Sequence, residues 1–252
     1  MTPAALRLDL RSLSWIAVFA VILVAWAAMF MMARMSGIDV WGRPVGMNMM
    51  PMTQFGALFG MWAIMMAAMM LPTMVPTLST YERLMVSADG TRAGWFGVLL
   101  GYSVAWAVFA AVIAAVQAAL IAAGWVNDLG ALTSRLLTAA LLIAVGAFQF
   151  SRTKAVCHGR CHAPMTFFLG RWRTGFGGGL DMGLRMGGFC TLCCWGFMAL
   201  GFAAGTMSLL WMGAATLFMV LEKLPAIGHR LIKPAGVILI VAGCGAAAMS
   251  IL

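Results

Sequence analysis

Charged residues are scarce in this sequence. Asp, Glu, Lys and Arg together make up 9% of its 252 residues, whereas soluble globular domains carry about 25%. Hydrophobic residues instead make up 63% of the chain. This composition argues against an ordinary soluble domain and is typical of integral membrane proteins.

Acidic residues are the scarcer charged class, with 7 Asp and Glu against 16 Lys and Arg. In a soluble protein this excess of positive charge would suggest a nucleic-acid partner. No run of Lys and Arg with interleaved aromatic residues occurs here, so we expect no nucleic-acid binding. Basic residues in short loops fix the topology of membrane proteins, and this accounts for the excess.

Histidine is nearly absent, with three residues in the chain. The sequence gives no support to Ser/His/Asp hydrolysis. The glycine-rich stretch GFGGGLDMG (residues 175–183) lacks the Lys-Ser/Thr pair of a phosphate-binding loop, and we interpret it as a flexible entry into a helix. These absences favour a protein that is not an enzyme.

Long apolar runs are abundant and predict an all-α, polytopic transmembrane helical bundle of about seven spans. We expect one integral membrane domain over residues 1–252. The first run is longer than the core of a cleaved signal peptide, so we expect a retained anchor. The predicted spans cover residues 14–34, 53–78, 94–123, 132–150, 187–206, 208–224 and 234–252.

The distribution of basic residues predicts a cytoplasmic amino terminus. With that orientation, thirteen Lys and Arg residues lie in inner segments and three in outer segments. The prediction includes a short cytoplasmic leader (residues 1–13), a cytoplasmic Cys/His loop (residues 151–186) and an outer carboxyl terminus. A re-entrant fifth segment would change the number of spans and reverse the end of the chain.

Five of the six cysteines lie between positions 157 and 194. Cys190, Cys193 and Cys194, in CTLCCWGFMALG, share one face of a helix. Thiolates are soft ligands that select Cu(I), zinc or iron–sulfur chemistry. The CxxC spacing also occurs in redox pairs, and a buried cysteine can serve packing alone. The pattern therefore leaves metal binding, redox chemistry and packing open.

The stretch CHGRCH contains a second group, Cys157, His158, Cys161 and His162. In a helix, the two cysteines would lie one turn apart, and so would the two histidines. Two sulfurs and two nitrogens suit zinc, and two thiolates suit Cu(I). A basic loop with incidental histidines is the alternative. The stretch forms a site of its own, or it folds back and joins the three cysteines downstream.

Methionine is unusually frequent, with 24 residues. Thioethers are soft, uncharged ligands for Cu(I), but methionine also fills gaps between packed helices. In the second predicted span, methionines form two rows at helical spacing, which are Met61, Met65 and Met69, and Met66, Met70 and Met74. An outward-facing stretch carries further candidates that would capture the ion, which are Met47, Met49, Met50 and Met52.

Few polar residues interrupt the predicted spans. Glu222, at the inner end of the sixth span, would be a metal ligand, a proton acceptor or the partner of a nearby arginine. Asp181 and Arg185 are four residues apart and should form an ion pair. Gln117 should donate or accept a hydrogen bond between helices.

The ordered set MWAIMMAAMMLPTMVP, CHGRCHAP, FFLGRWRTG, CTLCCWGFMALGFAAGTMSLLWM and VLEKLPAIG resembles a bacterial family of predicted metal-binding integral membrane proteins. Some members of that family are labelled copper chaperone. The resemblance covers about residues 60–230. It implies functional roles for Met61, Trp62, Met65, Met66, Met69, Met70, Pro72, Pro76, Cys157, Cys161, Pro164, Cys190, Cys193, Cys194, Trp195 and Glu222.

The sequence departs from the family pattern at two positions. Met186 stands where the family has a histidine four residues before the first cysteine of the triple, and Leu192 stands where it has glycine. A methionine ligand in place of a histidine softens the site and favours Cu(I) over Zn(II).

These observations lead to one hypothesis and two alternatives. We expect a multi-pass protein of the bacterial inner (plasma) membrane that binds copper as Cu(I), with zinc as the second choice of metal, and delivers it to another protein. A membrane thiol–disulfide electron carrier would use the same cysteines. A structural subunit of a membrane complex would use them only for packing.

Overall fold

The computed structural model describes residues 9–47, 53–224 and 227–251, and within these ranges the chain is all-α. This confirms the predicted fold class. The helices are α1 (Leu10–Met35), α2 (Phe55–Ser87), α3 (Arg92–Ala122), α4 (Arg135–Phe148), α5 (Arg152–His162), α6 (Pro164–Leu169), α7 (Gly175–Ala199), α8 (Gly201–Ala204), α9 (Leu209–Glu222) and α10 (Gly228–Ile251).

Five helical segments of the described chain are long and apolar enough to cross a membrane. They are α1, α2, α3, α7 continued by α8, and α10. Helices α4 and α5 meet at a bend of 63° and would add a sixth, broken span. Helix α9 has 14 residues, about 21 Å of helix against a hydrocarbon core of about 30 Å. Seven spans and the cytoplasmic amino terminus therefore stay predictions.

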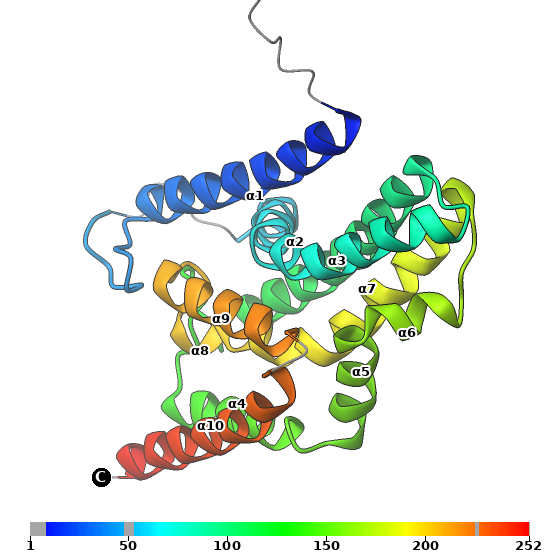
Figure 1. The fold of residues 1–252 in the computed structure, drawn as a ribbon. Coiled ribbons are helices and arrows are strands. Elements are labelled where there is room, and N and C mark those ends of the chain that lie inside the picture. Colours follow the sequence, from blue (N-terminus) through cyan, green and yellow to red (C-terminus); the bar gives the residue numbers. More distant parts are fainter. Residues whose placement is uncertain (1–8, 48–52, 225–226, 252) are drawn as a thin grey trace, which may run out of the picture.

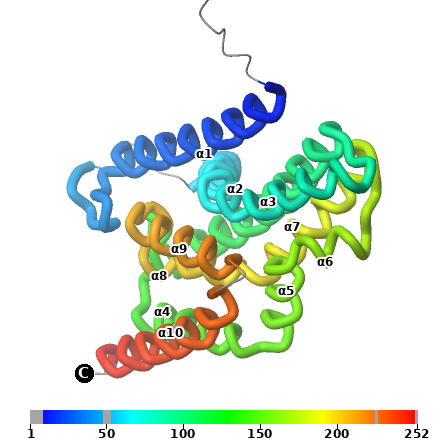
Figure 2. Tube along the Cα trace, viewed as in Figure 1, coloured from blue at the N-terminus to red at the C-terminus, as the bar shows by residue number. Residues whose placement is uncertain are grey.

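Helices α2 and α7 lie at the centre of the molecule. Helix α1 follows one edge, and α10 packs against α4 at the opposite edge (Figure 1). The chain trace shows α2 passing between α1 and α3 (Figure 2). In each of α2 and α7, 61% of the most apolar stretch is buried, against 28% in α1 and α3 and 22% in α10. The side chains of α2 and α7 therefore form most of the core.

Glycines set the distance between α3 and α7. On α7 they recur every fourth residue, at Gly175, Gly179, Gly183 and Gly187. A Cβ atom at Gly183 would collide with the carbonyl oxygen of Val98 on α3. Small residues at such spacing allow two helix backbones to approach closely. The stretch that we expected to be a flexible entry is thus the packed first part of α7, because interhelical contact compensates for its low helix propensity.

The region expected to be a Cys/His loop, residues 151–186, is also largely helical. It contains α5, α6 and the first part of α7. The side chain of Ser151 caps α5 by accepting a hydrogen bond from the backbone N–H of Lys154, at 3.0 Å. Pro164 opens α6 directly after α5 ends at His162. These two signals bound a short helix that carries the CHGRCH stretch against α7.

Candidate metal centre

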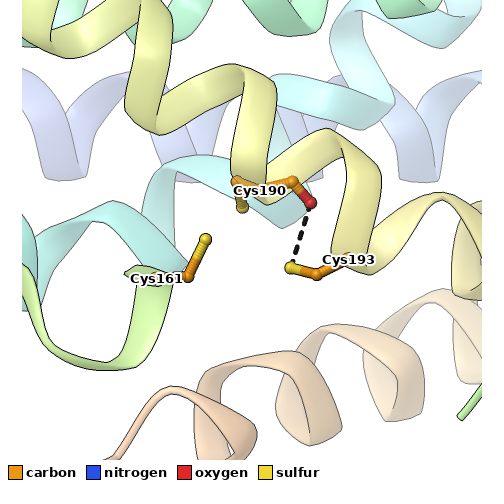
Figure 3. A group of neighbouring side chains, drawn as sticks. All are labelled: Cys161, Cys190 and Cys193. Atoms are coloured by element: carbon orange, nitrogen blue, oxygen red, sulfur yellow. Dashed lines mark hydrogen bonds between the residues drawn. The ribbon is translucent and has the colours of Figure 1, made fainter. Parts of the chain in front are cut away.

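Three buried cysteines meet where α5 packs against α7. Cys161 comes from the last turn of α5, and Cys190 and Cys193 lie one turn apart on α7 (Figure 3). Their Sγ atoms all lie within 4.8 Å of one another. The exposed fractions of the three residues are 4%, 0% and 3%. The stretch CHGRCH thus folds back onto the downstream cysteines, which was one of the two arrangements left open by the sequence.

One hydrogen bond within α7 and one between α5 and α7 form at this junction. The thiol of Cys193 donates to the carbonyl oxygen of Cys190, at 3.2 Å. The ammonium of Lys154, in the first turn of α5, donates to the carbonyl oxygen of Cys193, at 2.9 Å. A side chain of α5 therefore binds the backbone of α7 beside the cysteines and holds Cys161 in register with them.

Two further cysteines of the sequence pattern lie outside this group. Cys194 is buried, with its Sγ 3.3 Å from the Sγ of Cys193. Cys157 is buried one turn before Cys161. Neither belongs to the set of mutually close sulfurs. Only one of the two cysteines of CHGRCH therefore reaches the centre.

A buried lysine lies directly against the sulfurs. The ammonium of Lys223 is 3.0 Å from the Sγ of Cys190 and 2.9 Å from the Oγ1 of Thr73. The hydroxyl of Tyr102 is 3.2 Å from the same sulfur and 3.0 Å from the Thr73 hydroxyl. A buried ammonium needs a negative partner, because removing an unpaired charge from water is costly. Cys190, the sulfur in contact with the ammonium, would supply that charge as a thiolate.

Sequence reasoning missed Lys223, Thr73 and Tyr102. Lys223 follows Glu222 at the end of an apolar helix, and an ionisable residue at such a position is a functional candidate by itself. That signal was present in the sequence.

Glu222 pairs with groups of α5. Its carboxylate lies 2.5 Å from the Nζ of Lys154 and 3.4 Å from the Nδ1 of His158. The exposed fractions of the Lys154 and Glu222 side chains are 0% and 3%. The sequence left three roles open for Glu222: metal ligand, proton acceptor or partner of an arginine. In the structure Glu222 forms an ion pair, but its partners are Lys154 and His158 and not an arginine.

The set Cys157, His158, Cys161 and His162 is thus divided. Cys161 faces the sulfurs of α7, and His158 faces Glu222. The rings of His158 and His162 lie 5.0 Å apart, centroid to centroid. The geometry does not assemble two sulfurs and two nitrogens at one point, because helical rotation directs neighbouring side chains to different partners.

The candidate methionines of α2 are all buried, with exposed fractions of 3% or less. Met66 and Met70 line a cavity of about 110 Å³ together with Tyr102 and Trp106 of α3. Met186 is buried one turn before Cys190 on α7. Met47 is 84% exposed. Met49, Met50 and Met52 lie outside the described residues.

Two other sequence expectations are confirmed. The carboxylate of Asp181 accepts from the Nε of Arg185, at 2.9 Å. The amide oxygen of Gln117 on α3 accepts from the indole N–H of Trp62 on α2, at 2.7 Å, so it does link two helices.

Comparison with protein-family models decides the family. The model described as PpoB2, copper chaperone, matches residues 59–246, which include every cysteine of the chain. The chain belongs to this copper chaperone family. The resemblance stated from the sequence motifs is thereby confirmed. No curated protein sequence and no solved structure gave a significant match.

In this copper chaperone family member, the chemistry of the centre follows from its donor set. Three thiol sulfurs can converge on one soft ion, and the surrounding helices exclude water from it. The family and the cysteine group together indicate a metal, with copper as the ion that the family description names.

Proposed function

We propose that the chain is a membrane-embedded protein that binds Cu(I) at Cys161, Cys190 and Cys193 and delivers it to a partner protein. The convergence of these three buried sulfurs from two helices is the observation that carries the proposal. The copper chaperone family and the apolar helices support it.

The number and type of ligands favour Cu(I) over zinc. Structural zinc sites are almost always four-coordinate, whereas Cu(I) is selected by soft sulfur ligands. The sulfur of Cys194, 3.3 Å from that of Cys193, is outside the mutually close group. Three thiolates and one Cu(I) carry a net charge of −2, and the ammonium of Lys223 beside Cys190 offsets part of it.

We assign the remaining candidate ligands to supporting roles. Met66 and Met70 line a cavity together with Tyr102, which contacts Cys190, so they suit a relay of the ion toward the thiols. Met186 is a further thioether beside the site. Glu222, which also contacts His158, pairs with Lys154, and Lys154 donates to the backbone carbonyl of Cys193.

Release requires that at least one sulfur leaves the ion. Cys161 comes from a helix of 11 residues, whereas Cys190 and Cys193 share a long helix that is packed along α3. A shift of α5 would therefore open the site while two sulfurs stay in place. A partner thiolate would take the vacated coordination position.

The test is the copper content of protein purified in detergent under reducing, anaerobic conditions after growth with copper. Cys161→Ser is compared with Cys157→Ser, which changes an equally buried cysteine one turn away on the same helix. We expect about one copper per wild-type chain, loss in Cys161→Ser and retention in Cys157→Ser.

Two outcomes would replace the proposal. A chain without metal whose cysteines form a disulfide on exposure to air would be a thiol–disulfide carrier. A chain without metal or disulfide, in which replacing Cys190, Cys193 and Cys194 together lowers only stability, would be a structural subunit.

A further inference from the structure

A groove with a volume of about 710 Å³ lies between α1, α2 and the start of α3, apart from the cysteines. One part of its wall is apolar and includes Trp15 and Phe19 of α1 and Val75 and Val86 of α2. Phe19 and Val86 are exposed, at 49% and 91%. The groove is therefore an open, amphipathic surface and not part of the packed core.

The other part of the wall is strongly basic. Three arginines line it, Arg11, Arg83 and Arg92, together with one carboxylate, that of Glu82. Glu82 is 7% exposed at its side chain and accepts from Arg11, at 3.1 Å, and from Arg92, at 2.5 Å. Three cations and one anion leave a charge of 3 − 1 = +2 among the lining residues.

The two ion pairs orient Arg11 and Arg92 around the buried carboxylate. Arg83 is exposed and makes no ion pair among the residues that the structure describes. At the basic end of the groove, the N–H donors of Arg83 are therefore available to a ligand. Arg11 and Arg92 share the single negative charge of Glu82, so their two positive charges are only partly neutralised. Its charge complements an anion.

Aromatic residues indicate the depth of this end in a bilayer. Trp15 packs edge-on against Trp95, with ring centroids 5.7 Å apart. Nearby, Tyr81 stacks on Trp172 at 5.0 Å. The rings of Trp95 and Tyr81 are buried, whereas those of Trp15 and Trp172 are partly exposed. Exposed Trp collects at the level of lipid headgroups, and arginines gather at the inner surface, where anionic lipids lie. The basic end of the groove then faces phosphates, and its apolar wall faces acyl chains.

We propose that this groove binds an anionic phospholipid. The guanidinium groups of Arg83, Arg11 and Arg92 hold its phosphate, and an acyl chain packs along Trp15, Phe19 and Val75. The apolar wall selects a lipid over a free phosphate ion. The lipid fills the space between α1 and α2 and attaches α1 to the bundle. The proposal rests on membrane embedding but not on copper binding.

Native mass spectrometry of the full chain in detergent tests the proposal. Phosphatidylglycerol and phosphatidylcholine with identical acyl chains are titrated separately, for the wild type, Arg83→Gln and Arg230→Gln. Arg230 is an exposed arginine on the same predicted side of the membrane, outside the groove. One basic residue near an anionic lipid surface contributes about 1 kcal/mol, which is about fivefold in affinity.

We expect the wild type to prefer phosphatidylglycerol and Arg83→Gln to bind it about fivefold more weakly. Arg230→Gln should bind as the wild type does. Equal binding of both lipids, or equal loss in both variants, would overturn the proposal. Competition by inorganic phosphate at the concentration of the lipid would also overturn it, since the groove would then be a free-anion site.

A second measurement places the lipid. Phosphatidylglycerol with brominated acyl chains should quench the fluorescence of the wild type more than that of Trp15→Phe, because Trp15 lines the groove. Equal quenching would show that the lipid lies elsewhere. Copper content is measured on the same samples. If Arg83→Gln binds less lipid but keeps the copper content of the wild type, the lipid groove and the proposed metal site are independent of each other.

Discussion

Replacing Lys223 with methionine removes a buried positive charge from the proposed copper site and keeps most of the side-chain volume. The Nζ atom is 3.0 Å from the Sγ of Cys190. Two unit charges at that distance attract each other by about 5.5 kcal/mol at an effective dielectric constant of about 20. The charge is present with and without copper, so only a fraction of this energy affects copper binding.

That fraction follows from the change in charge at the site. Without copper, the ammonium faces one thiolate. With Cu(I) on three thiolates, it faces a net charge of −2 spread over sulfurs that are up to 4.8 Å apart. The additional negative charge lies roughly 6 Å from Nζ and contributes about 2.8 kcal/mol at the same dielectric constant. Lys223→Met should therefore weaken Cu(I) binding about a hundredfold.

Competition with the Cu(I) chelator bicinchoninate, under anaerobic conditions in detergent, measures this change. Lys223→Arg keeps the charge and should retain most of the affinity. Lys233→Met removes an exposed lysine of α10 and should leave the affinity unchanged. Equal or tighter copper binding in Lys223→Met would refute the reasoning and make Lys223 a competitor of the ion.

Three further predictions concern packing, the buried ion pair and the methionines. Gly183→Ala should lower the stability of the fold by about 1–3 kcal/mol through collision with α3. Gly188→Ala meets no atom within 4 Å and should not lower the midpoint of thermal unfolding, because alanine favours a helix over glycine by up to about 1 kcal/mol. An equal fall of the midpoint in both variants would contradict close α3–α7 packing. Glu222→Gln should cost about 3–5 kcal/mol because it leaves a buried lysine without its anion; an unchanged midpoint would show that the pair is not needed. Replacing both Met66 and Met70 with leucine should slow copper loading, followed by stopped-flow chelator exchange, without changing the final copper content; an unchanged rate would exclude these thioethers from the relay.

Much of the candidate site was predictable from residue type and spacing. The soft ligands were predictable from residue type, because cysteine and methionine carry the sulfur atoms that select Cu(I). Helical periodicity placed Cys190 and Cys193 on one face. The Asp181–Arg185 pair followed from the same periodicity. Predictions of this kind depend on contacts within one helix, where sequence distance fixes spatial distance.

Predictions that depended on packing between helices were less successful. The glycine-rich stretch at the start of α7 was read as flexible because glycine has a low helix propensity, but its contact with α3 makes it a packed helix. Two spans, expected over residues 132–150 and 208–224, are helices of only 14 residues each, α4 and α9. Helix α4 ends near a bend of 63° that separates it from α5.

The sequence alone determined that the protein is all-α, rich in apolar helices, a member of a copper chaperone family and supplied with soft ligands. Only the tertiary structure decided that Cys161 joins Cys190 and Cys193 while Cys157 does not, and that Lys223 lies against them. The physical reason is that Cys161 and Lys223 are each 29 or more positions away from Cys190 and Cys193 along the chain. Their meeting depends on how α5 turns back onto α7 and how closely α7 approaches α3, and neither is encoded in the period of a single helix.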